Sequence, residues 1–565
     1  YSPFRCMSNH SSTFTALRNS TYRRIWVASL VSSICISAHD TAATWVMNML
    51  SPSAFLLSLM STVASLPFFL FTLPAGALAD MVDRRKLLRF MNLWLACTAA
   101  LLALLFTFHW LTPALVLICI FLTGVGFAFN APAWTAIVPE IVTNEELPSA
   151  STLSGLQLNI SGIIGPALGG LALRFVTPNW VFATNAFCFL IVIFAIAQWK
   201  RPLRNSNLPL ENFLESFSTA IRYVRFAPGL QVVLLRNILF SIFICVIPAM
   251  LPVVGLQKLK FEPSSLGLLF TCMGAGAVFG AVFVVPKLRD HFHSNSIILS
   301  ASVLLVLVYL GMGLVLDHVL FMAIAAVAGI AWTVAASELW VVSQRAMPDW
   351  ARGRMNATII MVSQGAMALG GIIWGVLAST LGVTLTLEIA AGLLLLSLPL
   401  TIRLSIDFVG ELNFTPAPVT SLSHKLLHIP RPHDGPISIT YEFEVDRHRG
   451  SEFICLLRQV RLIHLRNGAF SWRLHEDLGR ANVYRIEMMM PSWTEHLLQK
   501  ERYTKTEKEI LDKAVSLHVG QEPPLERVFL CVNRELLGHV SILTHPSTMP
   551  TSPLDLGAQE LGNTA

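Results

Sequence analysis

Three carboxylates stand out because they lie inside apolar stretches, where a charged side chain is expensive. Asp40 follows His39 in the first such stretch, Glu338 lies in the tenth, and Glu388 lies in the twelfth. A charge at the centre of a bilayer costs about 3 kcal/mol or more, so residues of this kind usually serve transport. A carboxylate held at low dielectric constant can also exchange protons near neutral pH.

These positions predict proton chemistry, with an alternative at each. Asp40 is the first candidate for a proton carrier, and the alternative is a packing carboxylate bonded to Ser or Thr neighbours. His39 is either a relay or a satisfied polar residue. Glu338 is a candidate proton or substrate-cation site, or an interfacial residue, since Arg345 follows closely. Glu388 is expected at the rim of the membrane.

Amide and indole side chains in the same stretches are candidates for lining a substrate cavity. Indole rings stack on aromatic substrates, and anchoring at the membrane interface is an equal interpretation of them. The principal candidates are Asn48, Asn130, Trp134, Gln157 and Trp332, followed by Asn159, Asn185, Asn237 and Trp374.

The elements that hold these residues are membrane helices, as the composition indicates. Of the 565 residues, 54% are hydrophobic and 13% are charged, whereas about 25% are charged in ordinary soluble domains. This composition excludes a disordered chain, a fibrous repeat and a conventional soluble enzyme. Charge is much denser after residue 404. The fold class expected is therefore an all-α membrane domain followed by a soluble α+β domain.

Twelve apolar stretches are long enough to cross a hydrocarbon core of about 30 Å as helices. A polar segment divides them six and six, as in transporters built from two related halves with a substrate site between them. With the N-terminus in the cytoplasm, the basic residues before residue 405 all lie on the inner side except Arg174, Lys258 and Lys260, which satisfies the positive-inside rule. The predicted spans are 24–47, 54–79, 87–108, 113–135, 153–175, 180–199, 230–256, 264–286, 296–316, 319–343, 355–380 and 384–403.

The predicted domain boundaries follow from these spans and from composition. They are an N-terminal cytoplasmic segment (1–23), an N-terminal six-helix bundle (24–199), a cytoplasmic middle loop (200–229), a C-terminal six-helix bundle (230–404), a linker (405–435), a ferredoxin-like cytoplasmic domain (436–532) and a disordered tail (533–565).

The turn between spans 2 and 3 has a patterned sequence with Gly76, Asp80, Arg84, Arg85 and Lys86. It resembles the signature loop of the major facilitator superfamily, Gly-x-x-x-Asp-(Arg/Lys)-x-Gly-(Arg/Lys)-(Arg/Lys). The resemblance implies a twelve-helix transporter and a loop that gates the cytoplasmic side. Asp80 is then expected at a helix N-terminus, and the basic residues at the anionic inner leaflet. Met81 and Asp83 depart from the pattern, and a basic stop-transfer turn is the alternative.

Span 5 carries a glycine face that resembles the antiporter motif of drug–proton exporters in the superfamily. The motif comprises Gly162, Gly165, Pro166, Gly169 and Gly170. The resemblance implies close packing against span 8, where the counterparts expected are Gly274, Gly276 and Gly280. The arginine motif of such exporters is absent from span 4.

Other stretches of the sequence are similar to the transmembrane secretion effector branch of the superfamily, which neighbours the enterobactin-type siderophore exporters. The stretches that carry this similarity include 66–76, 130–134 and the loop between spans 10 and 11. In that loop the residues singled out are Arg345, Asp349, Arg352, Gly353 and Arg354. The resemblance implies export of a small molecule.

The polar C-terminal region predicts two helices and four strands in the order βαββαβ, which is the ferredoxin-like arrangement. The expected helices are 450–466 and 492–518, and the strands are 437–445, 469–478, 482–490 and 525–532. The region resembles small antibiotic-biosynthesis monooxygenases, which pair as dimers. Its Trp472, His475, Trp493 and His496 are candidates for lining a pocket of that kind, and a regulatory or dimerising module is the alternative.

No catalytic, cofactor or metal motif is evident. The nine cysteines include no Cys-x-x-Cys pair and are interpreted as small buried hydrophobic residues. Neither phosphate-binding glycine motif occurs, which argues against ATP-driven transport. We therefore expect no enzyme activity, no cofactor, no metal and no nucleic-acid partner. The expected partners are a small-molecule substrate, protons, the lipid bilayer and a second copy through the tail domain.

The sequence thus favours a secondary transporter of the bacterial inner membrane with both termini in the cytoplasm. It would export a small amphiphilic molecule of siderophore or drug type by alternating access, driven by proton antiport. The alternative is a membrane-tethered monooxygenase-like or regulatory protein whose tail carries the activity. Twelve spans argue against that alternative, because anchoring needs only one.

Overall fold

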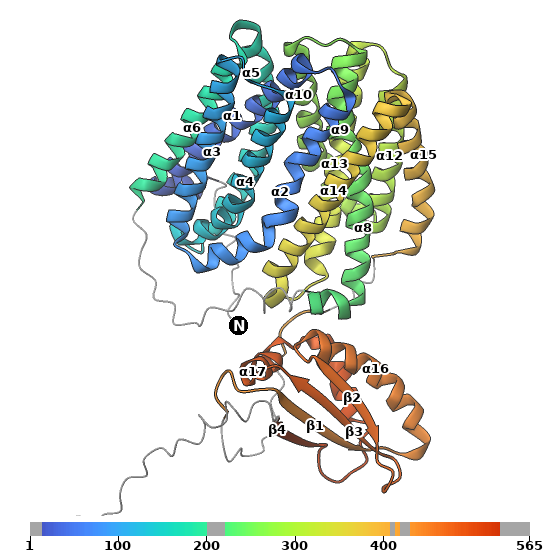
Figure 1. Ribbon diagram of the computed structural model, residues 1–565. Coiled ribbons are helices and arrows are strands. Elements are labelled where there is room, and N and C mark those ends of the chain that lie inside the picture. Colours follow the sequence, from blue (N-terminus) through green and yellow to red (C-terminus); the bar gives the residue numbers. More distant parts are fainter. Residues whose placement is uncertain (1–13, 200–220, 407–412, 418–429, 532–565) are drawn as a thin grey trace, which may run out of the picture. The chain divides into compact units, whose positions relative to one another are not determined.

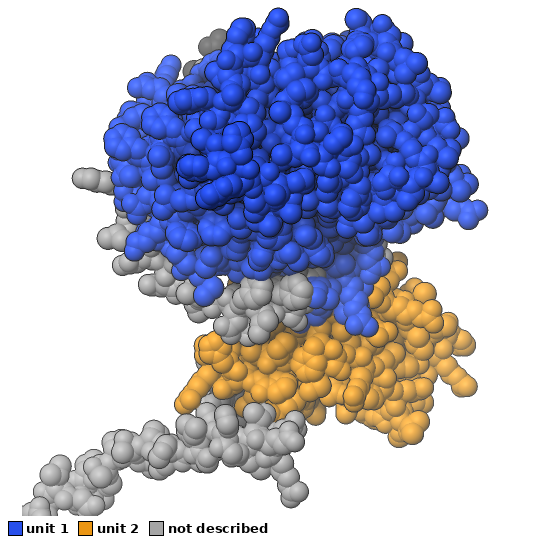
Figure 2. All heavy atoms as spheres, turned by 45° about the horizontal axis from the view of Figure 1, so that its top comes forward, with its two compact units in different colours: residues 1–414 blue, residues 415–565 orange. Residues whose placement is uncertain are grey.

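The computed structural model describes residues 14–199, 221–406, 413–417 and 430–531. The chain divides into two compact units, residues 1–414 and residues 415–565, which Figure 2 colours separately. The first unit is helical, and the second combines helices with a small antiparallel sheet (Figure 1). The predicted linker straddles the boundary between the units, and the predicted disordered tail lies outside the described residues.

The first unit contains, within the described ranges, twelve helical segments long and apolar enough to cross a membrane. Each coincides with one of the predicted spans, so the twelve-helix prediction is confirmed. The first six are α1 (Ser20–Leu50), α2 (Ala54–Met81), α3 (Arg84–Thr107), α4 (Pro113–Ile141), α5 (Leu147–Phe175) and α6 (Pro178–Gln198). The other six are α8–α9–η2 (Pro228–Ile244, Val246–Val253, Val254–Lys258), α10–η3–α11 (Pro263–Phe279, Gly280–Val284, Val285–His291), α12 (Ser294–Leu314), α13 (His318–Arg345), α14 (Arg352–Leu381) and α15 (Val383–Arg403).

Several helices begin earlier than their apolar stretch because polar side chains cap them. Asn19 accepts hydrogen bonds from the backbone N–H groups of Thr21 and Tyr22 at the start of α1. Asp83 caps α3 and Asp317 caps α13 in the same way. Such caps satisfy N–H groups that have no partner inside the helix. Part of the predicted middle loop is also helical, at residues 221–226.

Two spans contain a wide π-helical turn that the sequence did not reveal. These turns are η2 at the end of span 7 and η3 within span 8. In η2, the ammonium group of Lys258 donates to the carbonyl of Gly313 and lies 3.3 Å from the hydroxyl of Thr384. This lysine, an exception to the expected charge distribution, is therefore held by the ends of two neighbouring helices.

Because successive helices run in opposite directions, their connections lie alternately at two ends of the bundle. We call the end with loops 82–83, 142–146, 292–293 and 346–351 the basic end, since Arg84, Arg85 and Arg289 flank these loops. The opposite end has loops 51–53, 108–112, 176–177, 259–262 and 315–317.

The helices form two halves, α1–α6 and α8–α15, which we call the N-half and the C-half. They are joined by α2 packing along α14 and by α5 packing along α10. The largest buried cluster is centred on α9, where Val246, Ile247, Ala249, Met250 and Leu251 are completely buried.

The second unit has the ferredoxin-like element order that was predicted. Its antiparallel sheet has the order β2-β3-β1-β4, and helix and sheet side chains share one buried cluster. The predicted helix 492–518 is wrong in one respect, because it is two helices, α17 and α18. Thr504 starts α18 with a reciprocal capping box to Glu507, and this Thr-x-x-Glu spacing was the overlooked signal. The elements are β1 (Ile437–Glu444), α16 (Gly450–Arg466), β2 (Ser471–Glu476), β3 (Val483–Met490), α17 (Trp493–Arg502), α18 (Lys505–Val515) and β4 (Leu525–Leu530).

Candidate functional site

A cavity of about 630 Å³ lies within the N-half, and we call it the N-half cavity. Its polar lining comes from the part of each helix nearer the basic end. Four rings, Phe68, Phe127, Trp134 and Phe189, supply the aromatic part of the wall. Such a mixed surface suits a molecule with both apolar and hydrogen-bonding groups. The polar lining consists of Ser29, Ser32, Ser33, Asn92, Asn130, Thr135, Ser151, Ser154 and Gln157.

Gln157 fixes the wall of this cavity by bridging two helices. Its side-chain amide donates to the hydroxyl of Ser33 at 2.7 Å and to the carbonyl of Ser29 at 3.3 Å. Both acceptors are on α1, whereas Gln157 is on α5. The bridge therefore holds the serine-rich face of α1 against the cavity.

Three of the five principal cavity candidates are brought together here, namely Asn130, Trp134 and Gln157. Asn48 lies near the opposite end of α1, and Trp332 packs against the largest buried cluster, which contains residues of both halves. Trp374 is buried, and its indole N–H donates to the carbonyl of Ile242 at 2.8 Å. Trp374 is thus a packing residue rather than a stacking platform, since its ring has no open face.

Asp40 lies on the face of α1 that continues the cavity toward the opposite end. Its side chain is exposed, and it follows the cavity-lining Ser33 by seven residues, which is two turns of helix. It follows Val31, an exposed apolar residue, by nine residues, which is two and a half turns. Asp40 therefore points away from the outer surface and toward the interior of the bundle.

His39 points elsewhere, because adjacent residues of a helix are about 100° apart. It is buried, and its ring lies 4.7 Å from the ring of Phe182 on α6. Its Nδ1 atom has no hydrogen-bond partner among the described residues. His39 and Asp40 thus face different neighbours and do not form the relay considered from their adjacency.

Glu338 is a paired carboxylate near the basic end. It is 1% exposed and forms an ion pair with Arg289 of α11. The N-half has a comparable pair, Arg84 with Glu140 at 2.9 Å, whose carboxylate is 14% exposed. Glu388 is exposed and lies five residues after the start of α15, in the part of that helix nearer the opposite end; its position at the rim of the membrane stays a prediction.

The loop between α2 and α3 binds helix ends through its arginines. Besides its ion pair, Arg84 donates to the carbonyls of Ala79 and Ala136. Arg85 donates to the carbonyls of Ile196 and Ala197 at the end of α6. These guanidinium groups therefore tie the basic ends of α3, α4 and α6 together, while Lys86 is exposed. The expected place of the basic residues at the inner leaflet stays a prediction. The side chain of Asp80 lies outside the described residues.

The glycine face of α5 packs against two helices. Gly162 and Gly170 meet α10 at Gly274 and Gly267, whereas Gly165 and Gly169 meet α1 at Ser37 and Ala38. A Cβ atom at Gly170 would lie 2.7 Å from the Cα atom of Gly267. The predicted counterparts need one correction, because Gly276 and Gly280 pack against α13 at Ala326 and Ile330. The partner that the sequence did not single out is Gly267.

Two threonines that sequence reasoning missed join the halves. Thr62 on α2 donates to the carbonyl of Ala368 on α14 at 3.1 Å. Thr271 on α10 donates to the carbonyl of Ile163 on α5 at 3.0 Å. We call these two bonds the threonine latch. Hydroxyls inside helices usually bond their own backbone, so a sequence pattern does not reveal such crossings.

The loop between α13 and α14 is anchored by apolar residues between its charges. Met347 and Ala351 are buried, and Trp350 lies edge-on to Tyr223 with ring centres 5.6 Å apart. Arg345, Arg352 and Gly353 are exposed and Arg354 is half-buried. The side chain of Asp349 lies outside the described residues.

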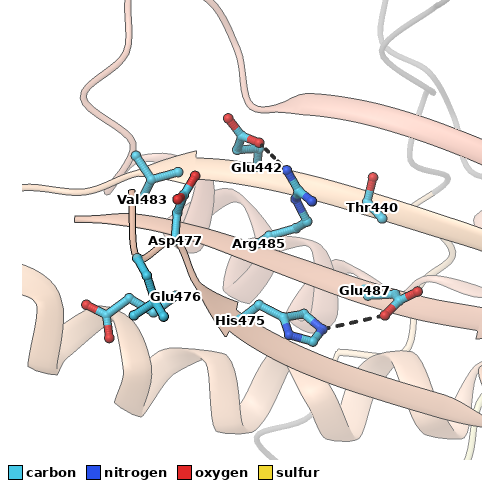
Figure 3. Close-up of a pocket in the computed structure, with 9 residues that line it drawn as sticks. Thr440, Glu442, His475, Glu476, Asp477, Val483, Arg485 and Glu487 are labelled. Carbon is cyan, nitrogen blue, oxygen red and sulfur yellow. Dashed lines mark hydrogen bonds and ion pairs between the residues drawn. The ribbon is translucent and has the colours of Figure 1, made fainter. Parts of the chain in front are cut away.

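The open face of the tail sheet carries a polar pocket of about 540 Å³. Figure 3 shows its paired groups: His475 lies 3.5 Å from Glu487, and Arg485 lies 3.2 Å from Glu442. Burial acts to raise the pKa of the Glu442 carboxyl, but its bonds to Arg485 and Arg480 lower that pKa below its ordinary value. The lining has more acidic than basic groups, because the carboxylates of Glu442, Glu476, Asp477 and Glu487 outnumber the guanidinium of Arg485.

The four residues proposed to line a monooxygenase-like pocket do not share one. Trp472 donates its indole N–H to Nδ1 of His464 on the helix side of the sheet at 3.1 Å. His475 lies three residues along the same strand and faces the open side, because strand side chains alternate. Trp493 and His496 contact each other on α17. Burial lowers the pKa of His464 to about 4, and burial with the nearby Lys500 does the same for His496.

Comparison with known families matches residues 11–536 to the family model described as transmembrane secretion effector. Among curated proteins, the macrolide efflux protein A of Streptococcus pyogenes is 22% identical over 64% of this chain and 89% of its own length. The staphyloferrin A transporter of Staphylococcus aureus is 23% identical over 60% and 84%. The enterobactin exporter EntS of Shigella boydii is 24% identical over 62% and 85%.

Solved transporter structures share the fold of the helical unit. The nucleoside transporter NupG, as a D323A mutant, matches with a TM-score of 0.57 at 12% identity, over 68% of this chain and 99% of that one. A bacterial homologue of the lysosomal transporter Spinster matches with a TM-score of 0.55 at 13% identity, over 70% and 97%.

Proposed function

The chain belongs to the transmembrane secretion effector family of the major facilitator superfamily, and from this premise we propose that it exports small amphiphilic molecules of siderophore or drug type by alternating access. It is a multi-pass membrane protein whose relatives are efflux transporters. The single observation that carries the proposal is the N-half cavity, which combines hydroxyl, amide and aromatic groups within a membrane bundle.

The arrangement of contacts supports a state in which the cavity opens toward the basic end. Gly170 and Gly267 bring α5 and α10 together near the opposite end, and Gly375 meets Ser58 of α2 there as well. The polar lining of the cavity lies on the other side of these contacts. Following the positive-inside rule, we assign the basic end and both termini to the cytoplasm and the protein to the bacterial inner membrane.

We assign proton coupling to Asp40. It is an acidic side chain on the interior face of α1, two turns from the cavity-lining Ser33. A carboxylate that alternates between the two sides can carry a proton inward while substrate leaves. Glu338 is less suited to this role because it is paired with Arg289.

The test is efflux from proteoliposomes with an imposed pH gradient, using a radiolabelled macrolide and a catecholate siderophore as separate probes. Asp40→Asn should abolish the dependence of efflux on the gradient. Glu388→Gln is the matched control, because it also removes a carboxylate from the membrane unit, and it should behave like the parent protein. Gradient-driven efflux that persists in Asp40→Asn would remove Asp40 from the mechanism. No transport of either probe in any gradient would count against the assigned substrate class.

Two further assignments concern the tail. The division of Trp472 and His475 between the two faces of the sheet gives no support to the monooxygenase-like alternative. Oxygen consumption by the full-length protein with an added quinol would reverse that judgement. Dimerisation through the tail remains a prediction, which sedimentation of the full chain in detergent would test.

A further inference from the structure

Two cysteine thiols meet where α1 and α6 pack together. The sulfur atoms of Cys35 and Cys188 lie 3.2 Å apart, and both residues are free cysteines. A disulfide has a sulfur–sulfur distance of about 2.05 Å, so bond formation requires an approach of about 1 Å.

The neighbouring contacts show that the two cysteines meet because α1 and α6 pack in a fixed antiparallel alignment. One turn further along α1, His39 packs against Phe182, which lies about two turns from Cys188 on α6. The two helices therefore run antiparallel in contact through both points. Cys35 and Cys188 each lie near the middle of their helix, and hence at the depth of the hydrocarbon core.

The thiol pair is reached from the lipid side of the bundle. Along α1, Cys35 follows Val27 and Val31 at intervals of four residues, and these valines are 47% and 42% exposed. Ser33, which lines the N-half cavity, is two residues away and about 200° around the helix. Cys35 is itself partly exposed, whereas Cys188 is buried. An oxidant dissolved in the bilayer therefore meets Cys35 first.

The surroundings of the pair favour thiol chemistry over metal binding. Within the described parts of the chain, no group of three or more His, Cys, Asp or Glu side chains is placed to hold a metal ion. Asn185, one turn from Cys188, is completely buried, and neither polar atom of its side chain has a partner in the described residues. Buried polar groups are normally paired. The unpaired amide of Asn185 therefore makes the contact between α1 and α6 around the two thiols more polar than a purely apolar helix contact.

We propose that Cys35 and Cys188 form a reversible dithiol–disulfide site that reacts with lipid-soluble two-electron oxidants of the quinone class. In the forward step both S–H bonds break and one S–S bond forms. The two electrons and two protons pass to the quinone, whose carbonyl oxygens become the hydroxyls of a hydroquinone. A membrane-permeant dithiol reverses the step by thiol–disulfide exchange: the added dithiol becomes the disulfide, and both cysteines return to thiols. The bond links α1 to α6 within one half and leaves the contacts between the halves free to change.

The experiment treats full-length protein in liposomes with decylubiquinone and then blocks and maps all thiols by mass spectrometry. The expected result is a peptide pair linked through Cys35 and Cys188, a mass lower by two hydrogens, and restoration of both thiols by dithiothreitol. A charged oxidant confined to the water outside should give at least tenfold less linkage. Cys35→Ser and Cys188→Ser should each abolish the linked pair.

Cys119→Ser is the matched control, since Cys119 is a buried cysteine of the same half, and linkage should be unchanged. The proposal is overturned if decylubiquinone gives no linked pair in the folded parent protein, or if linkage depends on the water-soluble oxidant. Tryptophan fluorescence and elution as a single species identify the folded protein in every sample. Neither reading depends on the substrate, so failure here is distinguishable from failure of the transport proposal.

Discussion

The two halves of the membrane unit share an architecture but differ in what their first helices contain. The first helix of the N-half, α1, carries Ser29, Ser32, Ser33 and Asp40 along its interior face. The corresponding span of the C-half, α8–α9–η2, buries its polar residues Arg236, Asn237 and Ser241. It continues in a completely buried apolar run from Val246 to Leu251, interrupted only by Pro248. The N-half therefore presents polar groups to a cavity, whereas the first span of the C-half packs its polar groups away.

This contrast predicts that added volume is tolerated on α5 beside the N-half cavity and rejected where the helices of the C-half pack closely. A Cβ atom at Gly276 would overlap the backbone carbonyl of Ala326, whereas one at Gly155 would meet no atom within 4 Å. Overpacking a core costs about 1–3 kcal/mol, and more where backbone must move. Gly276→Val should therefore lose most of its folded protein in thermal unfolding followed by size-exclusion chromatography. Gly155→Val should match the parent, and equal losses would break the contrast.

The ion pairs near the basic end should show the next largest difference. Arg289→Ala leaves a carboxylate that is 1% exposed, whereas Arg84→Ala leaves one that is 14% exposed. An uncompensated buried charge costs about 3–5 kcal/mol, and a partly solvated one costs about 1 kcal/mol. Denaturation in graded detergent and urea should rank the two variants in that order. Adding Glu338→Gln to Arg289→Ala should restore part of the loss, and no restoration would contradict the explanation.

A matched pair of amide substitutions compares the wall of the N-half cavity with the packed interior of the C-half. Gln157→Leu removes the bridge from α5 to Ser29 and Ser33 at the cavity wall. We expect about a tenfold loss of efflux, equivalent to about 1.4 kcal/mol, with little change in melting temperature. Asn237→Leu removes a buried amide of the C-half that donates to Val233 and Ser343. Its efflux per folded molecule should stay within about twofold of the parent, and the reverse order would place the substrate in the C-half.

Removing either hydrogen bond of the threonine latch should have the same effect on the contact between the halves. Thr62→Val and Thr271→Val each remove one hydroxyl at nearly constant volume. A hydrogen bond contributes about 1 kcal/mol. Each change should therefore shift the proposed equilibrium between the state open toward the basic end and the state open toward the opposite end by about fivefold. Spin-label distances across the opposite end would measure that shift. Unequal shifts would mean that the two hydrogen bonds contribute different free energies to the contact between the halves.

Helix positions followed from the sequence because span length and caps are local properties. The cavity was only partly predictable: Asn130, Trp134 and Gln157 share a wall because α4 and α5 pack beside α1, and that choice of neighbours is not local. Glu338 had an apolar environment in sequence, yet its partner Arg289 lies 49 residues away along the chain. The break before α18 was readable from Thr504 and Glu507, whereas the π turns left no pattern.

The chemistry of the latch has an electrical consequence. A hydroxyl that donates to a backbone carbonyl has no net charge, so a potential across the membrane exerts no net force on Thr62 or Thr271. A full charge moving through 100 mV gains or loses about 2.3 kcal/mol. Any voltage dependence of the transport cycle must therefore arise from the carboxylate of Asp40, from other ionised side chains that move, or from the charge of the cargo.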